Sequence, residues 1–341
     1  MSKIIKAFAL LLTALAVTAC GTDLNTAPPV YQTGFISMDT YISLTVYGEN
    51  RESAAKSCQS EIERLEELLS ATDSDSEVYK INSSEGMPVT ISNDTKAVIS
   101  QALLTAEESG GALDITLRPV VKEWGFTTGE YKVPDSAVLE KLLEKADYKA
   151  VQLKENIVSL PKDFQIDLGA VAKGYAGDKA IEKLKERGIT SALVNLGGNV
   201  QTLGAKPDGT SWNVAVKSPF DESSLCVLRV QNKAIVTSGN YERYFEDENG
   251  KRYHHIIDPA DGFPADNGIV SATVIGDKGL TCDALSTAIF VMGSDKAEKL
   301  WREKGDFEML LVTDDKKILV TEGILDSFSN SSNMEVTVIK K

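Results

Sequence analysis

IDLGAVAKGYAGD, residues 166–178, is the stretch that says most about the fold, because it marks a point where a strand is expected to lead into a helix. Residues 165–167 are typical of the end of a strand. The apolar residues that follow recur at helical spacing, which predicts a helix over residues 170–187. The stretch therefore predicts a joint between a strand and a helix.

Several chemically useful groups gather at this joint. Gly169 can adopt backbone angles closed to other residues and lets a ligand approach the main chain. Backbone N–H groups at a helix start are unpaired and favour an anion such as a phosphate, and Lys173 adds a positive charge one turn in. Asp167 suits a ribose hydroxyl, a ring N–H or a metal. An ordinary strand–loop–helix joint, with a solvated lysine and a capping aspartate, explains the same residues equally well.

The periodicity of the rest of the chain predicts an α+β fold. Helices are expected at residues 52–70, 93–109, 135–146, 279–292 and 295–304. Strands are expected at residues 34–48, 148–153, 156–160, 192–196, 200–203, 212–216, 225–230, 234–238, 253–257, 270–275, 307–312, 317–321 and 334–339. Residues 112–116 are expected to be a short extended segment, and Arg118-Pro119 to start a turn. Most strands form hairpins with helices clustered between them, which favours layered antiparallel or mixed sheets over a doubly wound parallel sheet.

Composition narrows the classes of function. The chain has 341 residues and a formal net charge of −14, and no basic stripe compensates, so a nucleic-acid partner is not expected. His254 and His255 are the only histidines, which excludes a histidine-rich metal site. Of the four cysteines, Cys20 is expected to carry a lipid; the other three, Cys58, Cys226 and Cys282, are an odd number without short-range pairing, which argues against a disulfide framework.

The first residues are expected to be a targeting segment. Lys3 and Lys6 precede an apolar run that is too short to span a bilayer comfortably, and a small-residue site follows, so residues 1–19 are interpreted as a lipoprotein signal peptide. Cys20 then becomes a lipidated N-terminus, and residues 20–33 a tether. The folded domain is expected over residues 34–341, outside the cytoplasmic membrane and anchored to it by lipid.

Two further motifs could carry chemistry. Asp283 and Thr287 are four residues apart at the start of a predicted helix, so they share one face and could hold a hard cation through oxygen. The alternative is that Asp283 caps the helix and Thr287 packs. Strand alternation puts His254 and His255 on opposite faces, so only one can face a given site, and a lone histidine is often structural.

Two further motif candidates, the glycine pair and Cys282, also have structural alternatives. The pair Gly197-Gly198 allows close approach of a ligand to the backbone, or forms a bulge or a hairpin turn. Cys282 is expected to be a small buried residue rather than a nucleophile.

Taken together and in order, these segments resemble the ApbE family of FAD:protein FMN transferases, over about residues 34–325. The matching segments are Met38-Asp39-Thr40, Gly111-Ala112-Leu113-Asp114, Asp167-Leu168-Gly169-Ala170 with Lys173-Gly174, Asn195-Leu196-Gly197-Gly198-Asn199, Ser238-Gly239-Asn240-Tyr241, His255-Ile256-Ile257-Asp258-Pro259, and Asp283-Ala284 with Thr287. The resemblance implies that the enzyme binds FAD as substrate with Mg²⁺ beside its pyrophosphate. It also implies that FMN passes to a threonine hydroxyl of a partner redox protein and that AMP is released.

The resemblance also implies a role for each site residue. FAD would be contacted by Met38, Ala112, Leu113, Asp114, Asp167, Lys173 and Ile257. The metal would be bound by Asp283, Thr287 and the backbone carbonyl of Ala170. His255 would assist removal of the proton from the acceptor threonine, since the pKa of histidine suits that task near neutral pH.

The chain departs from the family pattern at one place in the sequence that bears on ligand binding, and two rival functions use the same residues. Where many family members carry an aromatic residue followed by Asp-Pro, this chain has Ala71-Thr72-Asp73-Ser74, so a stacking partner for the ligand is absent there or comes from elsewhere. A hydrolase with the same site would cleave FAD to FMN and AMP. A lipid-tethered flavin-binding protein would bind FAD without turnover.

Overall fold

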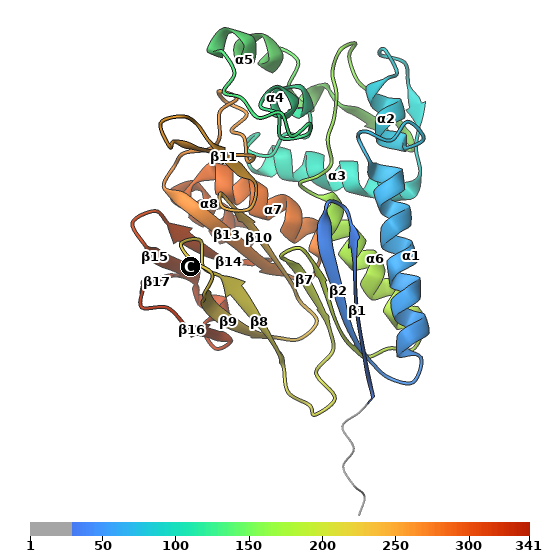
Figure 1. Ribbon diagram of the computed structural model, residues 1–341, viewed down its shortest axis with the longest axis vertical. Coiled ribbons are helices and arrows are strands. Elements are labelled where there is room, and N and C mark those ends of the chain that lie inside the picture. The colour runs from blue at the N-terminus through green and yellow to red at the C-terminus, as the bar shows by residue number, and fades with distance from the viewer. Residues whose placement is uncertain (1–28) are drawn as a thin grey trace, which may run out of the picture.

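The computed structural model describes residues 29–341, and its centre is a large sheet (Figure 1). The helices are α1 Arg51–Leu69, α2 Glu77–Asn82, α3 Asn93–Glu108, α4 Arg118–Glu123, α5 Ser136–Leu143, α6 Ala172–Glu186, α7 Gly279–Met292 and α8 Ser294–Lys304. The strands are β1 Val30–Ser37, β2 Thr40–Tyr47, β3 Val89–Thr90, β4 Gln152–Lys154, β5 Ile157–Ser159, β6 Ser191–Leu196, β7 Asn199–Leu203, β8 Trp212–Lys217, β9 Ser224–Val230, β10 Ala234–Gly239, β11 Tyr244–Glu246, β12 Arg252–His254, β13 Ile269–Gly276, β14 Glu308–Thr313, β15 Lys317–Thr321, β16 Phe328–Asn330 and β17 Glu335–Ile339.

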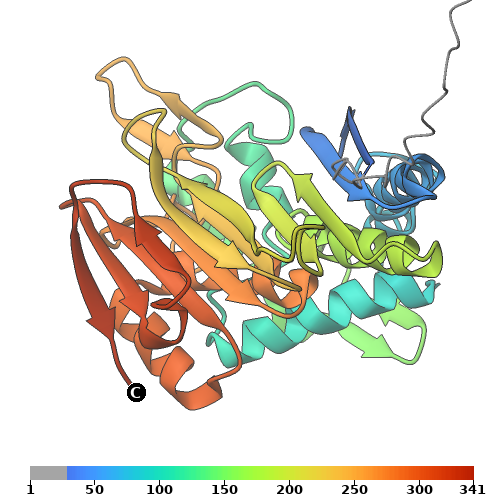
Figure 2. The ribbon, with the colours of Figure 1, turned by 90° about the horizontal axis from the view of Figure 1, so that it is seen from below.

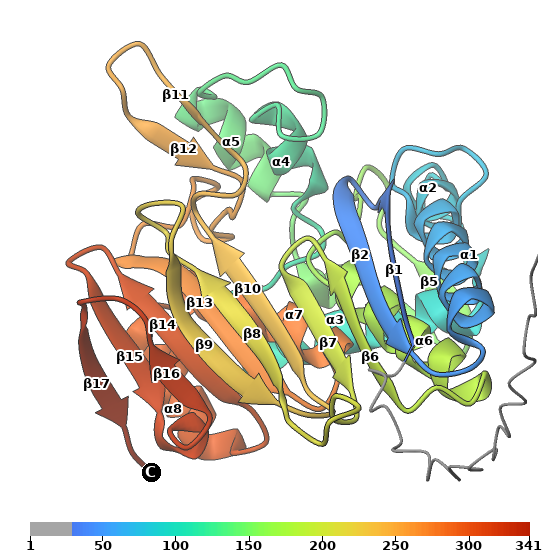
Figure 3. The same ribbon diagram turned by 60° about the horizontal axis from the view of Figure 1, so that its bottom comes forward.

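The large sheet has the strand order β1-β2-β6-β7-β10-β13-β14-β15-β17. Its pairings are antiparallel except for that of β15 with β17, which is parallel, so the sheet is mixed. Figure 3 shows this sheet crossing the molecule, with the small sheet of β8, β9 and β16 in front of part of it. The expectation of an α+β fold with layered sheets is confirmed.

Helices and the small sheet cover opposite faces of the large sheet. α6 and α7 contact β6, β7, β10 and β13, and α1 and α3 pack outside them (Figure 2). On the other face, Val214, Leu225 and Leu228 of the small sheet pack against Ile235 and Leu310 of the large one. Burial of these apolar faces on both sides drives the layering.

A separate group of elements lies at one end of the molecule. α4, α5 and the hairpin of β11 and β12 lie together at the top of Figure 1, apart from the main sheet. Their small core is aromatic and centres on Trp124, which packs against Phe126, Tyr253 and Phe263 and donates its ring N–H to the Gly262 carbonyl at 2.7 Å.

Several local expectations were wrong, among them the start of the strand expected over residues 148–153, because Tyr148–Ala150 is a 3₁₀ helix and β4 begins at Gln152. The single strand expected over residues 34–48 is a hairpin, because Met38 and Asp39 both take positive φ, at 52° and 57°, and turn the chain. Arg118-Pro119 starts helix α4 rather than a turn, with the proline in the first helical turn, where its missing N–H costs nothing. Residues 112–116 and 165–167 are not in strands; these two segments hold each other through the Asp167 N–H, which donates to the Ile115 carbonyl at 2.8 Å.

The expectations for the N-terminal segment lie mostly outside the described residues. The signal peptide, Cys20 and most of the tether fall in residues 1–28. The end of the tether does not, because β1 begins at Val30 and pairs with Tyr47 of β2. Within residues 29–341, no helix combines the length and the apolar character needed to cross a bilayer.

Candidate active site

A cavity of about 720 Å³ lies where the turns at one end of the large sheet meet the starts of α6 and α7. Its volume is within the roughly 300–1,000 Å³ of typical ligand-binding cavities. Every site residue predicted within the described part of the chain lines it, namely Met38, Ala112, Leu113, Asp114, Asp167, Ala170, Lys173, His255, Ile257, Asp283 and Thr287. The structure therefore brings together segments that are up to about 250 residues apart in the sequence.

The helices α6 and α7 cap each other at the edge of this cavity. Neither helix start has a capping side chain of its own at the N-cap position. Instead, the carboxylate of Asp178 in α6 accepts the N–H groups of Gly279 and Leu280, at 2.7 and 3.0 Å. In return, Asp283 of α7 accepts the Gly174 N–H of α6 at 2.7 Å. This exchange satisfies amides that a helix start leaves unpaired and fixes the two helices relative to each other.

Glycine allows the two helices to come this close. A Cβ atom on Gly174 would collide with the Gly279 carbonyl and the Asp283 side chain. Gln201 of β7 fills the remaining notch and donates its side-chain N–H to the Gly174 carbonyl at 2.9 Å. Gly174 is therefore needed for close packing of the two helices. Gly169, in contrast, does not adopt the left-handed backbone conformation that the sequence suggested for it.

The same exchange releases a carbonyl oxygen. In an unbroken helix the Gly174 N–H would bond to the Ala170 carbonyl, four residues earlier. Here it bonds to Asp283, and among residues 29–341 no backbone N–H bonds to Ala170 instead. The carbonyl of Ala170 is therefore available to another partner in the cavity.

Asp283 is the most buried carboxylate of the site. It is 5% exposed, and burial raises its pKa to about 6, opposed by the nearby Lys173 ammonium. One turn later, the hydroxyl of Thr287 lies 3.3 Å from the hydroxyl of Ser238 in β10, which also contacts Ser286 at 2.9 Å. The sequence analysis did not connect Ser238 with Thr287.

These oxygens fit a hard divalent cation. A carboxylate, a hydroxyl and a free carbonyl are the donor types that Mg²⁺ or Ca²⁺ takes, whereas zinc sites use mostly nitrogen and sulfur. Within residues 29–341 no three His, Cys, Asp or Glu side chains cluster into a metal site, so any cation here depends on this mixed set. Cys282 beside Asp283 is buried and its pKa is well above the usual thiol value, which fits a packing role rather than a nucleophile.

The two histidines face opposite sides, as alternation predicts. His254 is buried, and both ring nitrogens are used: Nε2–H donates to the Ala265 carbonyl at 3.1 Å, and Nδ1 accepts the Ile256 N–H at 3.3 Å. His255 lines the cavity with its ring edge toward Phe126. His254 is therefore structural, and His255 is the histidine that can act in the cavity.

The protonation state of His255 follows from its contacts. Its Nδ1 lies 3.1 Å from the Arg243 carbonyl, which can only accept, so Nδ1 carries the proton and Nε2 is bare. Burial, together with the Arg243 charge, lowers the pKa of His255 to about 3, well below the near-neutral value expected from the sequence. The imidazole is neutral at physiological pH and can accept a proton through Nε2.

The predicted FAD-contacting acids are held by local hydrogen bonds. Asp114 accepts the N–H and the hydroxyl of Thr116 at 2.7 and 2.6 Å and the Tyr148 N–H at 3.0 Å, so its carboxylate shapes the 112–116 loop. Asp167 accepts the Gly169 N–H at 2.8 Å and lies 3.4 Å from the Arg118 guanidinium. The Asp114 carboxylate is thus occupied by its own loop, while Asp167 keeps an oxygen beside the Arg118 guanidinium.

Two hairpin turns form part of the rim. Gly197 and Gly198, at φ 59° and 93°, close the β6–β7 hairpin, so the hairpin-turn alternative for this pair is the observed one. A Cβ on Gly197 would collide with Thr40, which follows the Met38 turn. Glu66 of α1 fixes that turn by accepting the Met38 N–H at 2.7 Å and the Ser37 hydroxyl at 2.6 Å.

Several cavity residues were not predicted. Glu66 has the sequence context of an ordinary solvated helix position, and Arg118 was taken as part of a turn. Arg243 contributes its backbone carbonyl, which contacts the His255 ring, and no sequence pattern predicts such a backbone contact. Phe126 lines the cavity near His255 and is an aromatic surface, although Ala71 and Thr72 occupy the place where an aromatic residue was expected.

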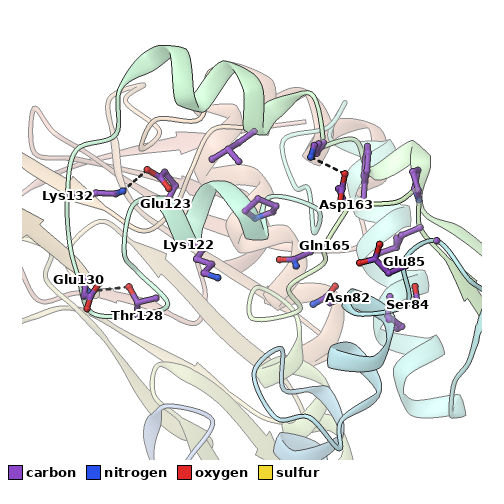
Figure 4. A pocket seen from close by; sticks show the side chains of 18 of the residues that line it. Asn82, Ser84, Glu85, Lys122, Glu123, Thr128, Glu130, Lys132, Asp163 and Gln165 are labelled. Atoms are coloured by element: carbon purple, nitrogen blue, oxygen red, sulfur yellow. Dashed lines mark hydrogen bonds and ion pairs between the residues drawn. The ribbon is translucent and has the colours of Figure 1, made fainter.

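A second cavity of about 790 Å³ lies between α2, α4 and residues 160–165 (Figure 4). Charged side chains that line it pair with one another, Lys132 with Glu123 at 2.6 Å and Lys145 with Asp163 at 3.3 Å. The Asn82 side chain donates a hydrogen bond to the Ile166 carbonyl and accepts one from the Ile166 N–H. None of the predicted site residues lines this cavity, so the chemistry is assigned to the first one.

Known proteins resemble this chain over most of its length. The model of the ApbE family matches residues 38–311. A FAD:protein FMN transferase of Treponema pallidum is 36% identical over 284 residues, covering 78% of each chain. One from Klebsiella pneumoniae is 34% identical and covers 86% of this chain and 92% of its own.

Solved structures show the same architecture. The crystal structure of the ApbE protein of Thermotoga maritima superposes with a TM-score of 0.82 at 32% identity, covering 88% of this chain and 99% of its own. The flavin transferase ApbE of Vibrio cholerae superposes with a TM-score of 0.78 at 26% identity, covering 88% of this chain and 100% of its own. With a family match over most of its length, and a cavity lined by the residues of the family motifs, this chain is a member of the ApbE family.

Proposed function

We propose that this chain transfers FMN from FAD to a threonine hydroxyl of a partner protein and releases AMP, with Mg²⁺ as cofactor. The transfer of FMN is supported by the relatives, which are named FAD:protein FMN transferases. The observation that carries the proposal for this chain is the cavity itself, where cation-binding oxygens and a neutral histidine face one space.

The residues that line the cavity suit the binding of Mg²⁺ and FAD. Asp283, Thr287 and the Ala170 carbonyl would hold Mg²⁺, which when bound neutralises charge on the FAD pyrophosphate. Lys173 and Arg118 line the same cavity and add positive charge beside the phosphates, which an acidic protein otherwise repels. Met38, Leu113 and Ile257 supply apolar surface for the flavin or the adenine.

His255 would act on the acceptor. Its bare Nε2 accepts the threonine proton as the hydroxyl oxygen bonds to the FMN phosphorus. The bond between that phosphorus and the bridging oxygen breaks, and AMP leaves with the electron pair. The Arg243 carbonyl keeps the imidazole in the tautomer that this step requires.

One incubation tests this function against its rivals. Full-length protein is mixed with FAD, Mg²⁺ and a candidate acceptor, and the products are run on a denaturing gel and by chromatography. A fluorescent acceptor band together with AMP supports transfer. Free FMN without a labelled band identifies a FAD pyrophosphatase, and bound FAD without AMP identifies a flavin-binding protein.

We also propose that Cys20 carries the lipid anchor, so that the domain faces outward from a bacterial cell membrane. The sequence Val17-Thr18-Ala19-Cys20 at the end of an apolar run supports this. Fractionation of cells that express the wild type and Cys20→Ser tests it. The wild type should sediment with membranes and the variant should not; equal distribution of both would contradict the anchor.

A further inference from the structure

Asn199, at the start of β7, has a side-chain amide without partners. It is 1% exposed, and among the described residues neither its Oδ1 nor its Nδ2 has a hydrogen-bond partner. Buried amides are almost always hydrogen-bonded, because leaving one unpaired forfeits the bonds that water would make. Such an amide therefore needs either a structural explanation or a ligand.

The position of Asn199 points to a ligand. The residue lines the cavity together with Asp283 and Thr287. Its amide is also close enough to Asp283 to favour the charged form of that carboxylate. Its backbone is fixed by pairing with Leu196 of β6 and Val236 of β10, so the amide is held in place beside the proposed cation site.

Other unpaired buried groups differ from Asn199. Within residues 29–341 these groups are the Ser191 and Ser271 hydroxyls, the Trp301 ring N–H and one Glu308 oxygen. Each leaves one atom unpaired, and none of these residues lines the cavity. Only the Asn199 side chain presents both a donor and an acceptor there.

We propose that Asn199 is a binding residue for a hydrated divalent cation. When the cation is bound, the side-chain N–H of Asn199 donates to the Asp283 carboxylate that holds the cation, and its carbonyl oxygen accepts a hydrogen bond from a water on the cation; without the cation neither bond is made. Mg²⁺ keeps several of its waters in protein sites, so an acceptor that lines the same cavity as the ligands can receive a hydrogen bond from one of those waters. Groups that hold the ligands and waters of a metal commonly change its affinity 10- to 100-fold.

This inference rests on the proposed function, because it needs the cation site of Asp283 and Thr287. The experiment titrates Mn²⁺ into the full-length chain with saturating FAD, and follows free Mn²⁺ by electron paramagnetic resonance. Asn199→Leu removes both polar atoms at similar size. Ser191→Ala is the matched control, because it also removes an unpaired buried polar group, away from the cavity.

The expected result combines affinity and stability. Asn199→Leu weakens Mn²⁺ binding about 10- to 100-fold while the melting temperature of the metal-free protein does not fall, since no hydrogen bond is lost. Ser191→Ala likewise keeps its melting temperature and binds Mn²⁺ like the wild type. Wild-type Mn²⁺ affinity in Asn199→Leu overturns the inference, as does an affinity loss accompanied by a fall in melting temperature, which assigns Asn199 to the fold.

The variant Asp283→Ala distinguishes a failure of the inference about Asn199 from a failure of the proposed cation site. If this variant loses Mn²⁺ binding while Asn199→Leu keeps it, the inference about Asn199 fails and the cation site stands. If the wild type itself binds no Mn²⁺ with FAD, the cation site and the inference fail together.

Discussion

Asp283→Asn should make the metal-free protein more stable while it abolishes activity. The substitution keeps the shape of the side chain and an oxygen that can accept the Gly174 N–H, but removes the negative charge. In the wild type, burial raises the pKa of Asp283 from 3.8 to about 6. An acid with a raised pKa in the folded state binds more protons folded than unfolded, so the free energy of unfolding falls as pH rises through that window.

The magnitude follows from the two pKa values. The rise to about 6 corresponds to about 3 kcal/mol of stability that the wild type loses between pH 4 and pH 7. The neutral asparagine does not titrate and avoids this loss. The difference in unfolding free energy between Asp283→Asn and the wild type should therefore grow by about 3 kcal/mol across this range, in favour of the variant.

Urea unfolding in EDTA at several pH values measures this difference directly. The exposed Asp326→Asn corrects for the general change in net charge. FMN transfer by Asp283→Asn should fall more than about 100-fold, because a cation ligand is lost. A stability difference that stays constant from pH 4 to pH 7 would refute the reasoning, because it would mean that Asp283 is not held in a raised-pKa environment.

Three other substitutions test separate parts of the site. His255→Asn should lower kcat for FMN transfer by about 10²- to 10⁴-fold with little change in FAD affinity, which a FAD titration checks. Because burial holds the pKa of His255 at about 3, protonation of this residue should cause no loss of wild-type activity near pH 6.5, which a pH profile checks. Gly174→Ala should lower the free energy of unfolding by about 1–3 kcal/mol, because its Cβ meets the Gly279 carbonyl, and chemical denaturation measures this. Asp178→Ala removes both bonds to the start of α7 and should weaken Mn²⁺ binding, whereas Asn267→Ala, which removes bonds to the Phe290 and Val291 carbonyls at the other end of α7, should cost stability and leave Mn²⁺ affinity unchanged.

Sequence patterns predicted those parts of the fold that depend on neighbouring residues. The bounds of α7 were predicted to the residue, and those of α1, α3 and α6 to within two, because each has a clear apolar face or a distinct end. The turn at Met38-Asp39 was missed because methionine is rarely found at positive φ and no glycine marks the turn, although Asp39 tolerates this conformation. The small helix α4 was missed because its proline was taken for the start of a turn.

The residues of the site were predicted from the sequence, but the hydrogen bonds between them were not. The motifs named the side chains that line the cavity, yet no pattern could pair Asp178 with Gly279, 101 positions away, or Gly174 with Asp283, 109 positions away. Asn199 was noticed only as part of a glycine turn, since its unpaired amide depends on what surrounds it in three dimensions.

The exchange of carboxylates between α6 and α7 also affects how the protein matures. The proposed cation site takes Asp283 and Thr287 from α7 and the Ala170 carbonyl from just before α6, so it is complete only after the two helices have docked. A polypeptide that has not yet formed α7 would lack Asp283 and Thr287 at the site and would be inert toward the nucleotide. Flavin capture would then report that these two helices have come together.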